Sequence, residues 1–360
     1  MVAEQGGHLT RSRTAVHHDA RRIESALRSR RAIVAGLWSV ILTAVATAWT
    51  ATGRGYPFGP GDPSAVLSPI GGVPASLGAP VGAVVGIVGV GLALAILGRQ
   101  SSHRGSRLVS GATWILAALL LLAVPDYRLL VIVAYTPLFL VGLPFDFVPV
   151  SSYLSVFKPP VVTQVFAVGG GLVWAAVALE RTPLFRSAEQ AARWGRRATA
   201  VAVAIPLVYA ATRWAWALGI PLGLTTELFE FGRASGLWAV GGGLATLAVV
   251  GAGLTTGLTL PWGERWPSWL PRIGGRPIPA WLPVIPAVVV AALVTSAGLM
   301  FVRLTAAGLI DEVFTPLRGI EGSWAALAPE LLWPIWGPAL ALAGFAYAYR
   351  RRPEGGPGRS

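Results

Sequence analysis

The sequence predicts an all-α integral membrane protein: about eight transmembrane helices arranged as four tandem hairpins, plus a re-entrant or interfacial segment at 129–145. Hydrophobic residues make up 54% of the 360 residues and charged residues 12%, which is about half the charged share of a soluble domain. Several uninterrupted apolar runs approach or exceed the roughly 20 residues that cross a bilayer. No polar stretch is long enough to fold as a separate soluble domain.

Eight apolar runs account for most of the chain. The expected spans are 32–51, 79–98, 108–124, 161–179, 198–218, 237–260, 282–304 and 330–349. Chain breakers and charges separate them. Seven Gly and five Pro lie in 52–78, arginines lie in 99–107 and 181–197, and Gly219 and Pro221 end the fifth span.

The segment 129–143 is the ambiguous one, because it is apolar but short and contains Pro137. If this segment does not cross the membrane, one side of the membrane holds 22 arginines and 7 acidic residues. The other side then holds 7 basic and 9 acidic residues. A crossing would move three arginine clusters outside, against the positive-inside rule. We therefore expect a transmembrane domain at 32–349 in the plasma membrane, with cytoplasmic tails at 1–31 and 350–360.

Each hairpin carries an arginine at or beyond the outer end of its outgoing helix, with acidic residues nearby. The arginines are Arg54, Arg128, Arg213 and Arg303, and the acidic residues are Asp62, Asp126, Asp146, Glu227, Glu230, Asp311 and Glu312. Tandem helical repeats of this kind occur in transporters, but an arginine at a helix end can also simply reach the interface. The candidate polar or ion-pair site comprises Arg213, Glu227, Glu230, Asp126, Arg128, Arg303, Asp311 and Glu312.

Arg213 is the one charge inside the fifth span, flanked by Trp214 and Trp216. A helix that begins at Thr199 places it about 21 Å along the helix axis, several ångströms below the outer edge of a hydrocarbon core about 30 Å thick. An arginine in that position needs a partner or must reach the interface. The sequence predicts a carboxylate partner: Glu227 or Glu230, or an acidic residue from a neighbouring hairpin such as Asp126 or Asp311.

The inner loop at 261–281 combines tryptophan, proline and arginine. Its candidate lipid-contact residues are Trp262, Arg265, Trp266, Trp269, Arg272 and Arg276. Tryptophan prefers the headgroup region of a bilayer, and arginine there can meet lipid phosphate. We interpret the loop as a contact for anionic lipid headgroups, while an aromatic belt on a rigid connection explains the same composition.

Five short strings resemble those of a group of multi-pass membrane proteins from actinobacteria. They are Asp126-Tyr-Arg, Arg213-Trp-Ala-Trp-Ala-Leu-Gly-Ile-Pro-Leu-Gly, Trp262-Gly-Glu, Pro271-Arg-Ile-Gly-Gly-Arg and Glu330-Leu-Leu-Trp-Pro-Ile-Trp-Gly. The resemblance covers about residues 32–350. That group has no assigned activity, so the resemblance implies a membrane location and no reaction.

Residues that would support catalysis or metal binding are scarce. The chain has no cysteine, which excludes disulfides and thiolate metal sites, and its four histidines lie outside the expected spans. It contains no phosphate-binding Gly-Lys-Ser/Thr loop and no Gly-x-Ser-x-Gly elbow. No acidic residue lies at the centre of an expected span. We therefore expect no cofactor, no metal and no nucleic-acid partner, because the membrane orientation already explains the net charge of +13.

Two classes of function remain. The first is transport or lipid handling, with a polar site between helices near the outer face. The second is a non-catalytic scaffold that assembles with another membrane protein. A water-filled cavity lined by Arg213 and Thr212 would favour the first class, and a tightly packed bundle with an exposed face of small residues would favour the second. An enzyme acting on a lipid-linked substrate is least favoured, because no second catalytic group accompanies an outer carboxylate.

Overall fold

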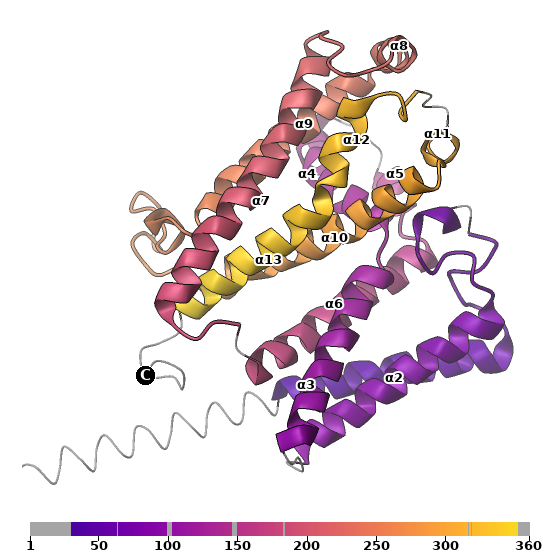
Figure 1. The fold of residues 1–360 in the computed structure, drawn as a ribbon, viewed down its shortest axis with the longest axis vertical. Coiled ribbons are helices and arrows are strands. Elements are labelled where there is room, and N and C mark those ends of the chain that lie inside the picture. Colours follow the sequence, from indigo (N-terminus) through magenta and orange to yellow (C-terminus); the bar gives the residue numbers. More distant parts are fainter. Residues whose placement is uncertain are drawn as a thin grey trace, which may run out of the picture. The chain divides into compact units, whose positions relative to one another are not determined.

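The computed structural model describes residues 30–62, 64–98, 103–145, 150–182, 184–315, 317 and 319–351 (Figure 1). All regular secondary structure in this part of the chain is helical, which confirms the predicted all-α class. The predicted tails at 1–31 and 350–360 lie outside the described residues, apart from two residues of each.

Among the described residues, eight helices are long and apolar enough to cross a membrane, as many as the sequence predicts. They are Arg30–Thr52, α2 (Ala75–Leu97), Gly105–Ala123, α6 (Pro159–Arg181), α7 (Ala188–Ala217), α9 (Leu237–Thr256), α10 (Trp281–Ala306) and Trp324–Arg350. Gly105–Ala123 joins α3 (His103–Ala118) to a π-helical segment, η2 (Leu119–Ala123). Trp324–Arg350 consists of α12 (Trp324–Leu331) and α13 (Trp333–Arg350). The arrangement as four tandem hairpins stays a prediction.

The segment predicted at 129–145 forms one helix, α4 (Tyr127–Gly142), and a 3₁₀ turn, η3 (Leu143–Phe145). Pro137 lies inside α4 and does not end it. Sixteen residues rise about 24 Å, less than a hydrocarbon core of about 30 Å. The re-entrant or interfacial placement stays a prediction. The remaining short elements are η1 (Ala65–Leu67), α5 (Val150–Leu154), α8 (Thr226–Ala234), η4 (Pro261–Gly263) and α11 (Ile310–Val313).

The chain divides into two compact units. The first unit consists of Met1–Tyr56, Pro74–Ala118 and Gly169–Pro183, and the second of Pro57–Val73, Leu119–Val168 and Leu184–Ser360. Within the first unit, α2 packs closely on the helix Arg30–Thr52. A Cβ atom at Gly86 would lie 2.8 Å from the amide nitrogen of Thr43 and 3.0 Å from the carbonyl oxygen of Ser39. Small residues of this kind let membrane helices approach closely.

Gly86→Ala is expected to lower the free energy of unfolding by about 1–3 kcal/mol, because the added methyl meets backbone atoms of the neighbouring helix. Gly91→Ala in the same helix is the matched control, since nothing lies within 4 Å of a Cβ atom there and alanine is the better helix former. Thermal unfolding of the two variants in one detergent measures the difference. Equal midpoints would show that Gly86 does not set the distance between the two helices.

The second unit is built on α7, α10 and α13. α7 packs against α9 and α13, α10 packs against α13, and α4 contacts both α9 and α10. α10 is the most buried of the eight apolar helices, with 61% of its most apolar 18-residue stretch buried. In α9, only 17% of the corresponding stretch is buried. α9 therefore presents most of its apolar surface outward, as a helix that faces lipid would.

Candidate functional site

A buried ion pair joins α7 to α12. Arg213, near the end of α7, is only 8% exposed and donates a hydrogen bond to the carboxylate of Glu330. The rings of Tyr209 and Trp216 lie 4.3 and 4.5 Å from its guanidinium carbon, so two aromatic faces shield the charge. The same guanidinium donates to the hydroxyl of Thr212 at 2.9 Å.

The carbonyl group of Ala325 also depends on Arg213. In an α-helix this carbonyl would accept a hydrogen bond from the amide of residue 329, but Pro329 has no amide hydrogen. Arg213 supplies the missing donor, at 3.0 Å. An unpaired carbonyl in the hydrocarbon region costs several kcal/mol. One guanidinium therefore satisfies two buried acceptors on α12, Oε1 of Glu330 and this carbonyl.

The beginning of α12 is fixed next to the ion pair by the loop between α7 and α8. The amide of Ala325 donates to the carbonyl of Gly223 at 3.3 Å, and the amide of Thr225 donates to the hydroxyl of Ser323 at 2.9 Å. Gly223 has a φ of 61°, and a Cβ atom there would lie 2.7 Å from the Cβ atom of Ala325. Only glycine fits this turn without strain.

The predicted contact between Arg213 and a carboxylate is present, but the partner is Glu330 and none of the four residues that were named. Glu227 and Glu230 lie exposed on α8. The eighth membrane-length helix begins at Trp324, six residues before the predicted start at 330. Glu330 therefore lies within this helix, near its beginning, and is 4% exposed.

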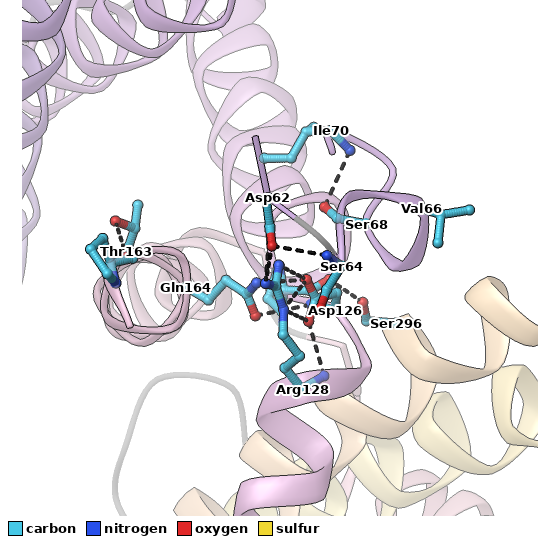
Figure 2. A network of polar contacts seen from close by, with 12 residues as sticks. Asp62, Ser64, Val66, Ser68, Ile70, Asp126, Arg128, Thr163, Gln164 and Ser296 are labelled. Carbon is cyan, nitrogen blue, oxygen red and sulfur yellow. Dashed lines mark hydrogen bonds and ion pairs between the residues drawn. The ribbon is translucent and has the colours of Figure 1, made fainter. Parts of the chain in front are cut away.

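A second buried polar group, the Arg128 cluster, consists of Asp62, Asp126, Arg128 and Gln164 (Figure 2). The Arg128 side chain donates to both carboxylate oxygens of Asp126 and to both of Asp62, and these four distances lie between 2.8 and 3.1 Å. Gln164 of α6 donates to Asp126 at 2.7 Å. Burial by itself lowers the pKa of Arg128, but the two carboxylates outweigh burial and raise this pKa above its ordinary value. The guanidinium stays charged.

The Arg128 cluster fixes the N-terminus of α4 and thereby positions Tyr127. The hydroxyl of Ser296 on α10 donates to the carbonyl of Pro125, just before this helix (Figure 2). Tyr127 lies between two cluster residues in sequence, and its ring packs edge-on against Phe301 and Phe314, with centroid distances of 5.8 and 6.1 Å. α4 is therefore held to α10 by both polar and aromatic contacts.

The other predicted site residues lie apart from these two groups. Arg303 is exposed and donates to the carbonyl of Val66 at 2.8 Å. Asp311 accepts three hydrogen bonds from the backbone amides of residues 319–321, and Glu312 is exposed. Gln164 and Glu330 are not among the predicted site residues, because each gains its role only from a partner distant in sequence.

The predicted lipid-contact loop folds as a turn docked on the end of α13. The amide of Trp266 donates to the carbonyl of Arg276 at 2.9 Å. Glu264 forms ion pairs with Arg350 and Arg351, at 3.6 and 4.0 Å. Five of the six predicted contact residues are exposed and Trp266 is half-buried; the exposed ones are Trp262, Arg265, Trp269, Arg272 and Arg276.

An apolar cavity of about 470 Å³, the large chamber, lies among α4, α7, α9, α10 and α13. No charged side chain is among the described residues that line it. Six lining side chains are also exposed: Val133, Tyr135 and Pro137 on α4, Val250 and Leu254 on α9, and Pro286 on α10. Because five of the six lie on α4 and α9, the chamber opens mainly between these two helices. Its volume lies within the range of about 300–1,000 Å³ that is typical of small-molecule sites.

A smaller cavity of about 190 Å³, the small chamber, lies beside Arg213. Its lining includes Trp216 and Trp238, whose indole N–H groups already donate to backbone carbonyls. Tyr127, Tyr135 and Tyr209 line both chambers. Arg213 thus lines a cavity, whereas Thr212, the other residue expected to line it, is not among the lining residues.

Comparisons of this chain with protein-family models, curated proteins and solved structures found no match. The resemblance to actinobacterial membrane proteins stays a prediction. The second unit offers an apolar chamber that opens at a helix surface, and a charge-balanced ion pair at the adjoining cavity.

Arg213→Ala is expected to lower the free energy of unfolding by about 3–5 kcal/mol, because Glu330 then keeps a buried charge without a partner. Adding Glu330→Gln should recover part of this loss. Adding Pro329→Ala should recover a separate part, because alanine restores an amide donor for the carbonyl of Ala325. Denaturant unfolding in micelles measures these three variants against the unaltered chain.

Arg303→Ala is the control for removing a guanidinium, since Arg303 is exposed. It should change the free energy of unfolding by less than about 1 kcal/mol. If Arg213→Ala lowered the free energy of unfolding no more than this control does, Arg213 would not be satisfying the acceptors on α12. The same would follow if neither second substitution recovered stability.

Proposed function

We propose that this chain is a multi-pass membrane protein that handles lipid by admitting a hydrocarbon chain from the bilayer into the large chamber. The observation that carries the proposal is the opening between α4 and α9, bordered by apolar side chains. α9 is the least buried of the eight apolar helices, so in a bilayer this opening would face lipid. A hydrocarbon chain entering there avoids the desolvation penalty that a polar solute would meet.

The scaffold alternative is less well supported. It would be favoured by a tightly packed bundle with an exposed face of small residues. The glycines of α2 that approach a neighbouring helix, such as Gly86, instead pack against the helix Arg30–Thr52 within the first unit. The second unit contains two cavities, one of them beside Arg213.

The proposal includes the orientation that the charge distribution favours: plasma membrane, with both termini in the cytoplasm. The loop at 261–281 would then meet the cytoplasmic leaflet. Its exposed tryptophans suit the headgroup region, and its exposed arginines suit anionic lipid phosphates. Arg213 and the Arg128 cluster would lie toward the outer face.

Topology tags test this orientation. Tags at the N-terminus, near Arg193 and at the C-terminus should report the cytoplasm, and a tag within 61–66 should report the outside, because basic loops stay inside. A tag near Arg193 that reports the outside would mean that α4 crosses the membrane and that every later loop is reversed.

Filling the large chamber tests lipid uptake. A phospholipid with a photoreactive diazirine in its acyl chain should label peptides that line the chamber, and Ala248→Trp should reduce this labelling several-fold by occupying the space. Ala248 lines the chamber on α9. Ala239→Trp is the matched control, because Ala239 is exposed on the same helix and should leave the labelling unchanged. Labelling confined to outward helix faces, or unaffected by Ala248→Trp, would contradict uptake.

A further inference from the structure

The two chambers lie end to end along the helices of the second unit. The small chamber is lined by the end of α7, at Arg213 and Trp216, and by the beginning of α9, from Leu237. The large chamber is lined by earlier residues of α7 and by α9 from Leu244 to its end. α7 and α9 are antiparallel neighbours, so the end of α7 lies beside the beginning of α9. The lining of the small chamber therefore continues into the lining of the large chamber.

The combined space carries no net charge. Arg213 is the only charged side chain among the described residues that line either chamber, and Glu330 pairs with it. A charged head group placed there would add an unbalanced charge to a buried site of low dielectric. An uncharged polar group meets no such penalty if its hydrogen bonds are satisfied.

Hydrogen-bonding groups gather where the chambers meet. Tyr127, Tyr135 and Tyr209 line both chambers, and each hydroxyl can donate and accept one or more hydrogen bonds. Nearby, three buried polar atoms have no hydrogen-bond partner within the described chain: Oε2 of Glu330 and the indole nitrogens of Trp333 and Trp336. Both tryptophans line the large chamber. Hydroxyl and carbonyl oxygens are the groups that suit these donors and acceptors.

We propose that the two chambers together bind one uncharged amphiphile, with a single hydrocarbon chain in the large chamber and a hydroxyl or carbonyl oxygen at the three tyrosines. The small chamber takes the rest of the polar end. This inference rests on the proposed function, which supplies the hydrocarbon chain, and adds the chemical class of the head group. The Arg128 cluster supports the site by holding Tyr127 in the shared wall.

The experiment uses the full chain in phosphatidylcholine nanodiscs and two probes: a diazirine-bearing fatty alcohol and its phosphate monoester with the identical chain. The alcohol should label the chamber-lining peptides several-fold more than the phosphate does. Tyr127→Phe and Tyr135→Phe should each weaken retention of the alcohol about two- to tenfold, the effect of one lost hydrogen bond. Tyr153→Phe is the control, because Tyr153 bonds to Thr136 and lines neither chamber.

The outcomes separate this inference from the proposed function. Equal or stronger labelling by the phosphate, or retention of the alcohol that both tyrosine variants leave unchanged, would overturn the uncharged head group while chain uptake stands. If neither probe labels the chamber, uptake itself is wrong. The comparison of the two probes uses the unaltered chain, so it holds even if a variant folds poorly.

Discussion

The guanidinium of Arg213 satisfies two acceptors that α12 could not otherwise bury. Pro329 removes the amide that would pair with the carbonyl of Ala325, and Glu330 places a carboxylate one residue later. Irregular backbone at membrane depth is tolerated only where protein covers it or where it lines a cavity. α12 meets this condition by packing on α7, with Arg213 supplying a hydrogen bond to both acceptors.

The break between α12 and α13 has a consequence for the chamber. Trp333 and Trp336 follow the break, and both line the large chamber. Another wall of the large chamber is α4, whose N-terminus is held by the Arg128 cluster and by Ser296. The Arg213–Glu330 pair and the Arg128 cluster thus fix these walls at helix ends, where backbone groups need hydrogen-bond partners. The interior of the large chamber stays apolar. Such an interior suits a hydrocarbon chain with its polar end at the tyrosines.

The number of spans could be predicted because the length of an apolar run is a local property. The need of Arg213 for a carboxylate could be predicted for the same reason. Its partner could not, because Glu330 lies 117 residues away in sequence. The continuity of α4 through Pro137 could not be predicted either. The chambers depend on how five helices pack, and no local pattern in the sequence records that.

The most direct test is a density map of the full chain in a lipid nanodisc, at a resolution that shows side chains. We expect elongated density that enters between α4 and α9 and fills the large chamber, with Arg213 bonded to Glu330 and to the carbonyl of Ala325. A chamber closed by α4 and filled with side chains would contradict the account. So would an Arg213 side chain directed into the headgroups, more than about 6 Å from any carboxylate and so outside charge-pairing range.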